Sequence, residues 1–137
     1  FGYTNAELTA DAPDLGGVKG ESLPDTPEVT AALSAEYRFA LSNYEAFAGG
    51  VVRYVDDRNA NFDLAQGMPQ YHLPDYTAVD LRTGMNVGGT RFQLYCRNVT
   101  NERGQLSAIT GTSVLGGPAN VSILQPRTYG LSVDVSF

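Results

Sequence analysis

Alternation of apolar and polar residues is the feature that most constrains the fold of this chain. It runs through six stretches of roughly ten to twelve residues, whereas a helical period is nearly absent. Successive side chains of a β-strand point to opposite faces, so each stretch predicts a strand with one apolar face. The stretches cover residues 1–10, 28–39, 44–55, 76–87, 90–98 and 129–137, and the first is the weakest.

The last stretch carries the alternation to the final residue. Its apolar face holds Tyr129, Leu131, Val133, Val135 and Phe137, opposite Thr128, Gly130, Ser132, Asp134 and Ser136. Terminal residues of most domains are poorly ordered unless they are tied down. A terminal aromatic residue in register with an apolar face therefore indicates that the end of the chain has a role.

The connections between the predicted strands alternate strictly between long and short. Residues 11–27, 56–75 and 101–126 form long connections, and residues 40–43 and 88–89 form short ones. Tight turns at one end and extended loops at the other are typical of outer-membrane barrels. We predict an all-β fold, an antiparallel up-and-down meander of about six strands that is part of a larger transmembrane β-barrel.

Alternation alone does not say which face is the interior. A self-contained soluble β-sandwich or small β-barrel acting as a binding module would bury the apolar face, whereas a membrane barrel turns it towards lipid. Aromatic residues gather near the predicted strand ends, which favours two membrane girdles. These residues are Tyr37, Phe39, Tyr44, Phe92 and Phe137 at the tight-turn end, and Tyr54, Tyr76 and Tyr129 at the other.

The face opposite the apolar one carries charges of both signs. In a membrane barrel these side chains would face the lumen and pair across neighbouring strands. The predicted lumen-facing residues are Glu36, Arg38, Arg53, Asp80, Arg82, Arg97 and Asp134.

Composition excludes several classes of function. The net charge of −6 and the lack of a basic stripe argue against nucleic acid. No run of about 18 apolar residues predicts a membrane-spanning helix. One histidine and one cysteine form no ligand cluster, and no nucleophile and base stand at an interpretable spacing, so we expect neither a metal, a cofactor nor an enzyme.

One loop invites a test as a calcium site. Asp57, Asn59, Asn61 and Asp63 occupy alternating positions, but an EF-hand needs Gly and Glu where the chain has Phe62 and Met68. The EF-hand is rejected. A looser ion or ligand contact by these four residues stays open beside the simpler interpretation of a solvated, turn-rich loop.

Three segments carry a resemblance to a known family. They are "LPDYTAVDLRTGM" (73–85), "RFQLYCRNVTNERG" (91–104) and "PRTYGLSVDVSF" (126–137). They resemble the C-terminal end of TonB-dependent outer-membrane receptors, the active transporters of Gram-negative bacteria. Asn98, Val99, Thr100 and Asn101 resemble the N-L-x-D/N motif of that family, with Val in place of Leu, and "GESLPDTPEVTAALSAEYRF" (20–39) is similar to its loop leading into a strand.

The resemblance implies part of a barrel of about 22 strands around an N-terminal plug. Neither the plug nor the segment that recruits TonB is in the sequence, and six strands fall short of the eight that the smallest bacterial barrel needs. We therefore expect residues 1–137 to be the C-terminal portion of a receptor barrel, with the plug domain and N-terminal strands absent.

The same resemblance implies a location and partners. Tyr129, Leu131, Val133, Val135 and Phe137 would form the signal read by the barrel-assembly machinery in the cell outer membrane. Other partners would be membrane lipid, the TonB complex through the missing plug region, and a small-molecule substrate such as a ferric siderophore, cobalamin or a glycan. The long connections would be extracellular, and their excess of acid would favour cationic or metal-chelate substrates, or simply solubility.

Overall fold

The structure, a computed structural model, describes residues 1–63, 70–110 and 118–136. The chain divides into two compact units. The loop unit comprises residues Phe1–Ala31, Tyr54–Tyr76 and Arg103–Leu124, and the strand unit comprises Ala32–Arg53, Thr77–Glu102 and Gln125–Phe137.

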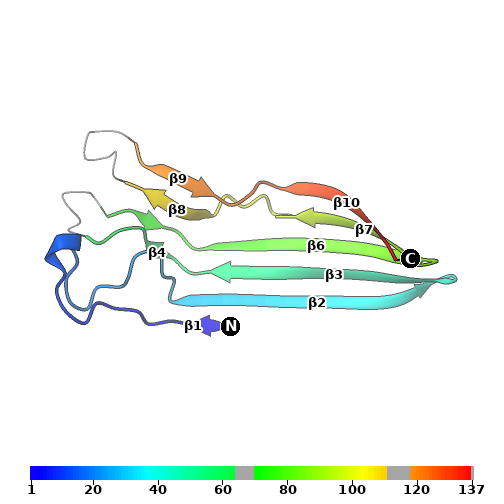
Figure 1. Ribbon diagram of the computed structural model, residues 1–137, viewed down its shortest axis with the longest axis horizontal. Coiled ribbons are helices and arrows are strands. Elements are labelled where there is room, and N and C mark those ends of the chain that lie inside the picture. The colour runs from blue at the N-terminus through cyan, green and yellow to red at the C-terminus, as the bar shows by residue number, and fades with distance from the viewer. Residues whose placement is uncertain (64–69, 111–117, 137) are drawn as a thin grey trace. The chain divides into compact units, whose positions relative to one another are not determined.

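Six strands form one antiparallel meander, as predicted (Figure 1). They are β1 (Gly2–Tyr3), β2 (Val29–Leu41), β3 (Tyr44–Val55), β6 (Tyr76–Val87), β7 (Thr90–Arg97) and β10 (Thr128–Val135). The order in the sheet is β1-β2-β3-β6-β7-β10, so each long strand lies beside the next long strand of the chain.

The first strand is much shorter than predicted. Residues 1–10 alternate weakly, but only Gly2 and Tyr3 pair with β2. The backbone of Leu8 instead bonds within the loop unit, where its N–H donates to the Glu21 carbonyl at 2.9 Å and its carbonyl accepts from the Gly20 N–H at 2.8 Å. Because these groups are satisfied in the loop, the chain leaves the sheet after Tyr3.

The long connections contain secondary structure that the sequence analysis did not predict. β4 (Arg58–Asn59) pairs with β5 (His72–Leu73), β8 (Gln105–Ile109) pairs with β9 (Asn120–Ile123), and a short 3₁₀ helix, η1, covers Pro13–Leu15. None of the described residues forms a helix long and apolar enough to cross a membrane.

The short connections are tight turns, as predicted. β6 and β7 are joined by Gly88 and Gly89, whose φ values are 52° and 84°. Two consecutive residues with positive φ define the turn that best matches the twist of a hairpin, and glycine adopts this conformation without steric cost.

The register places the apolar residues of neighbouring strands together. Leu94 on β7 lies opposite Leu131 on β10 and Thr83 on β6, and Phe92 lies opposite Val133 and Met85. This shared surface, the apolar face, is open: Leu94 is 58% exposed and Leu131 is 63% exposed. The strands that carry this face form a single sheet and not the sandwich that was the alternative.

Gly130 allows one of the close contacts on the opposite, polar face. Gly130 on β10 lies directly opposite Tyr95 on β7, and a Cβ atom at Gly130 would collide with the Tyr95 ring. Because Gly130 has no side chain, the Tyr95 ring can lie across the backbone of β10 at this position.

We predict that Gly130→Ala destabilises the intact receptor by about 1–3 kcal/mol, the usual cost of overpacking. In a Tyr95→Ala background the same substitution should cost almost nothing, because the colliding ring is gone. The urea midpoints of the four members of this mutant cycle measure the coupling. Equal costs in the two backgrounds would show that the ring does not require glycine there.

Candidate functional site

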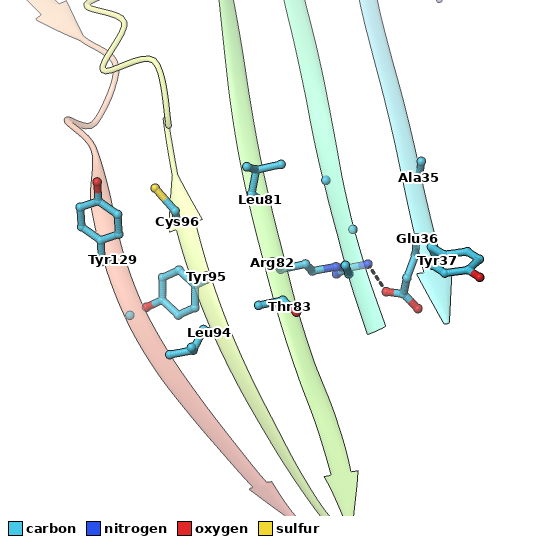
Figure 2. Close-up of a pocket in the computed structure, with 14 residues that line it drawn as sticks. Ala35, Glu36, Tyr37, Leu81, Arg82, Thr83, Leu94, Tyr95, Cys96 and Tyr129 are labelled. Atoms are coloured by element: carbon cyan, nitrogen blue, oxygen red, sulfur yellow. Dashed lines mark hydrogen bonds and ion pairs between the residues drawn. The ribbon is translucent and has the colours of Figure 1, made fainter. Parts of the chain in front are cut away.

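The polar face carries a network of ion pairs in the strand unit. Arg82 on β6 donates to Glu36 on β2 at 2.8 Å, so its side chain reaches across β3 (Figure 2). Glu36 also accepts from Arg38 at 3.0 Å. Separately, Arg53 on β3 donates to Asp80 on β6 at 2.9 Å. The pairing across neighbouring strands expected from the sequence is present at Arg53–Asp80, whereas Arg82–Glu36 joins strands on either side of β3 and Glu36–Arg38 lies within β2.

Two other arginines of the polar face lie over aromatic rings. The Arg91 guanidinium carbon is 4.2 Å from the centre of the Phe47 ring, and that of Arg97 is 5.1 Å from the centre of the Tyr95 ring. Phe47 is only 3% exposed. The sequence pattern did not point to Phe47, because an apolar residue at a polar-face position interrupts the alternation.

The residues of the predicted assembly signal lie on one strand. Tyr129, Leu131, Val133 and Val135 alternate along β10 on the apolar face, and each is exposed. Phe137 lies outside the described residues. Asp134, on the polar face, is opposite Arg91 in register, and its Oδ2 accepts a hydrogen bond from the Ser132 hydroxyl at 3.0 Å.

A groove of about 930 Å³ crosses the middle of these strands. Its lining is mainly small or apolar and includes Ala35, Ala48, Leu81, Leu94 and Cys96, several of which are drawn in Figure 2. Cys96 lies between Leu81 and Tyr129 in register and is a free thiol among apolar neighbours. The groove therefore belongs to the apolar surface of the strands.

The corner between β7 and β10 is organised by Asn98, which is 4% exposed. Its Nδ2 donates to the carbonyls of Glu102 and Gln125, both at 2.8 Å, and its Oδ1 accepts from the Glu102 N–H at 2.8 Å. Its own N–H donates to Asp80 Oδ1 at 2.8 Å. One side chain thus satisfies three backbone groups that the end of the strand leaves unpaired.

Asn101 completes the same corner. Its N–H donates to the Asn98 carbonyl at 2.9 Å, and its Oδ1 accepts from the Arg127 N–H at 3.1 Å. Both asparagines have positive φ, 51° at Asn98 and 56° at Asn101. Asparagine tolerates this conformation better than most residues other than glycine, which accounts for asparagine at both motif positions.

The loop unit is held by a buried arginine. Arg58, 9% exposed, donates through Nη2 to the carbonyls of Gln105 at 3.2 Å and Leu106 at 2.7 Å. These carbonyls belong to β8 at an irregularity in its pairing with β9. Arg58 is opposite Leu73, which is completely buried. Arg58 therefore joins the two short hairpins of the loop unit, and the Tyr71 hydroxyl adds a second link by donating to Gln105 Oε1 at 3.1 Å.

The four residues of the possible ion site make contacts within the loop unit. Asn61 Oδ1 accepts from the Tyr71 N–H at 2.9 Å, and Asn59 Oδ1 lies 3.4 Å from His72 Nδ1. Asp57 Oδ2 is 3.7 Å from His72 Nε2, and the Asp63 N–H donates to Glu21 at 2.7 Å. Among the described residues, no three His, Cys, Asp or Glu side chains are grouped to hold a metal ion.

Charge is distributed unevenly between the two units. The loop unit contains ten acidic and three basic residues, and the strand unit contains five acidic and six basic residues. The acidity of the whole chain therefore resides in the predicted extracellular connections.

A meander with an exposed apolar face, an ion-paired polar face and long loops at one end has the features of a membrane-barrel wall. Residues 1–101 match the family described as TonB dependent receptor-like, beta-barrel. The chain belongs to this family, whose members are transporters of the Gram-negative outer membrane and not enzymes.

The solved structure of BauA, the ferric preacinetobactin receptor from Acinetobacter baumannii, has a similar fold. The TM-score is 0.68 at 23% sequence identity, and the match covers 96% of this chain and 18% of BauA. The chain thus spans about a fifth of that receptor. No curated protein sequence matches the chain.

Proposed function

We propose that residues 1–137 form the C-terminal portion of the barrel of a TonB-dependent active transporter. Its plug domain and N-terminal strands would lie outside this sequence. The intact protein imports a scarce solute, such as a ferric siderophore, cobalamin or a glycan, across the outer membrane. The proposal is supported chiefly by the register, which aligns exposed apolar residues on one face and paired charges on the other.

Each surface has its own part in this function. The apolar face contacts lipid, and the polar face, with Glu36, Arg38, Arg53, Asp80, Arg82, Arg97 and Asp134, lines the lumen. The loop unit faces the medium, where its ordered hairpins meet the solute. The TonB complex acts through the plug region that precedes this segment.

The end of β10 serves assembly. We predict that deletion of Phe137 reduces the amount of intact receptor inserted in the outer membrane severalfold, because the apolar pattern of Tyr129, Leu131, Val133 and Val135 loses its last member. Uptake and binding are measured with labelled ferric siderophores, cobalamin and oligosaccharides. Uptake per cell should fall in proportion to insertion, with unchanged ligand affinity per inserted receptor.

Phe137→Tyr is the matched control, since it keeps an aromatic ring at this position and should insert normally. Wild-type amounts of the Phe137 deletion variant in the outer membrane would contradict the assembly role.

A further inference from the structure

A second cavity, of about 440 Å³, has a lining drawn mainly from the polar face, with Gly50 and Leu81 as exceptions. Cavities of this size accommodate small ligands or a few side chains of a partner. The polar side chains that line it come from β6, β7 and β10 and are Asp80, Arg82, Gln93, Tyr95, Arg97 and Ser132.

Three of these side chains have partners within the sheet, the simplest being Ser132, whose hydroxyl donates to Asp134. Asp80 accepts from Arg53 through Oδ2 and from the Asn98 N–H through Oδ1, so both carboxylate oxygens are used. Arg82 is paired with Glu36. The negative charge of Asp80 is therefore neutralised, and the cavity does not need a cation.

The other groups offer unused hydrogen-bond donors. Within the described part of the chain, the Gln93 amide, the Tyr95 hydroxyl and the Arg97 guanidinium make no hydrogen bond or ion pair. Arg97 lies over the Tyr95 ring, which orients the guanidinium plane without using its N–H groups. An oriented guanidinium presents a fork of donors that matches the two oxygens of a carboxylate.

We propose that this cavity is a carboxylate-binding site on the barrel wall, with Arg97 as the charged contact and Tyr95 and Gln93 as further donors. The inference rests on the proposed function, because it takes the polar face as the lumen wall. The carboxylate belongs either to a solute in transit or to an acidic side chain of polypeptide within the lumen. Both sources supply a carboxylate group to Arg97. They are distinguished by whether the receptor binds a soluble carboxylate probe.

The test uses the intact receptor in detergent solution, with citrate as a carboxylate probe and glycerol as a neutral one. Calorimetric titration should show citrate binding that Arg97→Gln weakens about tenfold and Arg97→Lys weakens less, since lysine keeps the charge but loses the fork. Arg127→Gln removes an arginine of the same unit that does not line the cavity, and it should leave citrate affinity unchanged. Glycerol should not bind.

If polypeptide supplies the carboxylate, wild-type receptor does not bind citrate. Arg97→Gln then lowers the thermal unfolding midpoint more than Arg127→Gln does, and 1 M NaCl removes the difference by screening. The proposal is overturned if Arg97→Gln changes neither citrate binding nor the midpoint. Outer-membrane insertion is measured in parallel: failed insertion of the wild-type receptor would count against the proposed function, whereas normal insertion with a silent Arg97 variant counts only against this site.

Discussion

Asn98→Ala should destabilise the intact receptor by about 3 kcal/mol, the largest effect that we expect from a single substitution on the polar side of the sheet. The variant removes the side-chain hydrogen-bond partner of the Glu102 carbonyl, the Gln125 carbonyl and the Glu102 N–H. Asn98 is almost completely buried. Each buried polar group left unsatisfied costs about 1–3 kcal/mol. The urea midpoint of the receptor folded into lipid vesicles measures the loss.

Two further variants separate the causes. Asn98→Gly keeps the positive φ free of strain but lacks the amide, so it should remain nearly as unstable as Asn98→Ala. Asn101→Ala removes one side-chain hydrogen bond and should cost about 1 kcal/mol. Recovery of wild-type stability in Asn98→Gly would show that backbone strain, rather than the hydrogen bonds of Asn98, controls this corner.

Leu33→Arg should lower the stability of the inserted receptor by about 2–4 kcal/mol, whereas Ser34→Arg should change it by less than about 1 kcal/mol. The two residues are neighbours on β2 and point to opposite faces. Leu33 belongs to the apolar face and is 73% exposed, so an arginine there would enter hydrocarbon. Ser34 belongs to the polar face, where mixed charge is already present.

The measurement is the urea midpoint of each variant in vesicles, together with the fraction inserted in the outer membrane. Equal losses for the two arginine variants would contradict the assignment of the apolar face to lipid. A larger loss of stability for Ser34→Arg than for Leu33→Arg would show that the polar face, and not the apolar face, contacts lipid.

The strands were the most predictable part of the fold. The predicted ranges 44–55 and 76–87 agree with β3 and β6, because period-2 alternation is a local property that each strand carries by itself. The glycine pair at 88–89 likewise marked a hairpin, since its positive φ values depend mainly on those two residues. The order of the sheet followed from the general preference of successive strands to lie side by side, which holds here across the long connections as well as the tight turns.

Contacts between distant residues were less predictable. The alternation at 1–10 suggested a strand, but Leu8 bonds instead to Gly20 and Glu21 in the loop unit. The sequence did not indicate the contact made by Phe47, because that contact is with Arg91, which lies on another strand. Asn98 stood out only as part of a family motif, and its hydrogen bond to the Gln125 carbonyl could not be predicted from the motif's spacing.

The sequence by itself determined that the chain forms two-faced strands joined by alternating long and tight connections, because strand periodicity and turn chemistry are encoded by adjacent residues. Only the tertiary structure decided that the apolar face is left open, that Asn98 closes the β7–β10 corner, and that the long connections contain paired hairpins. These features depend on contacts between residues that are distant in the sequence. Strand register determines such contacts across the sheet, and in the loops they follow from the need of each buried polar group for a hydrogen-bond partner.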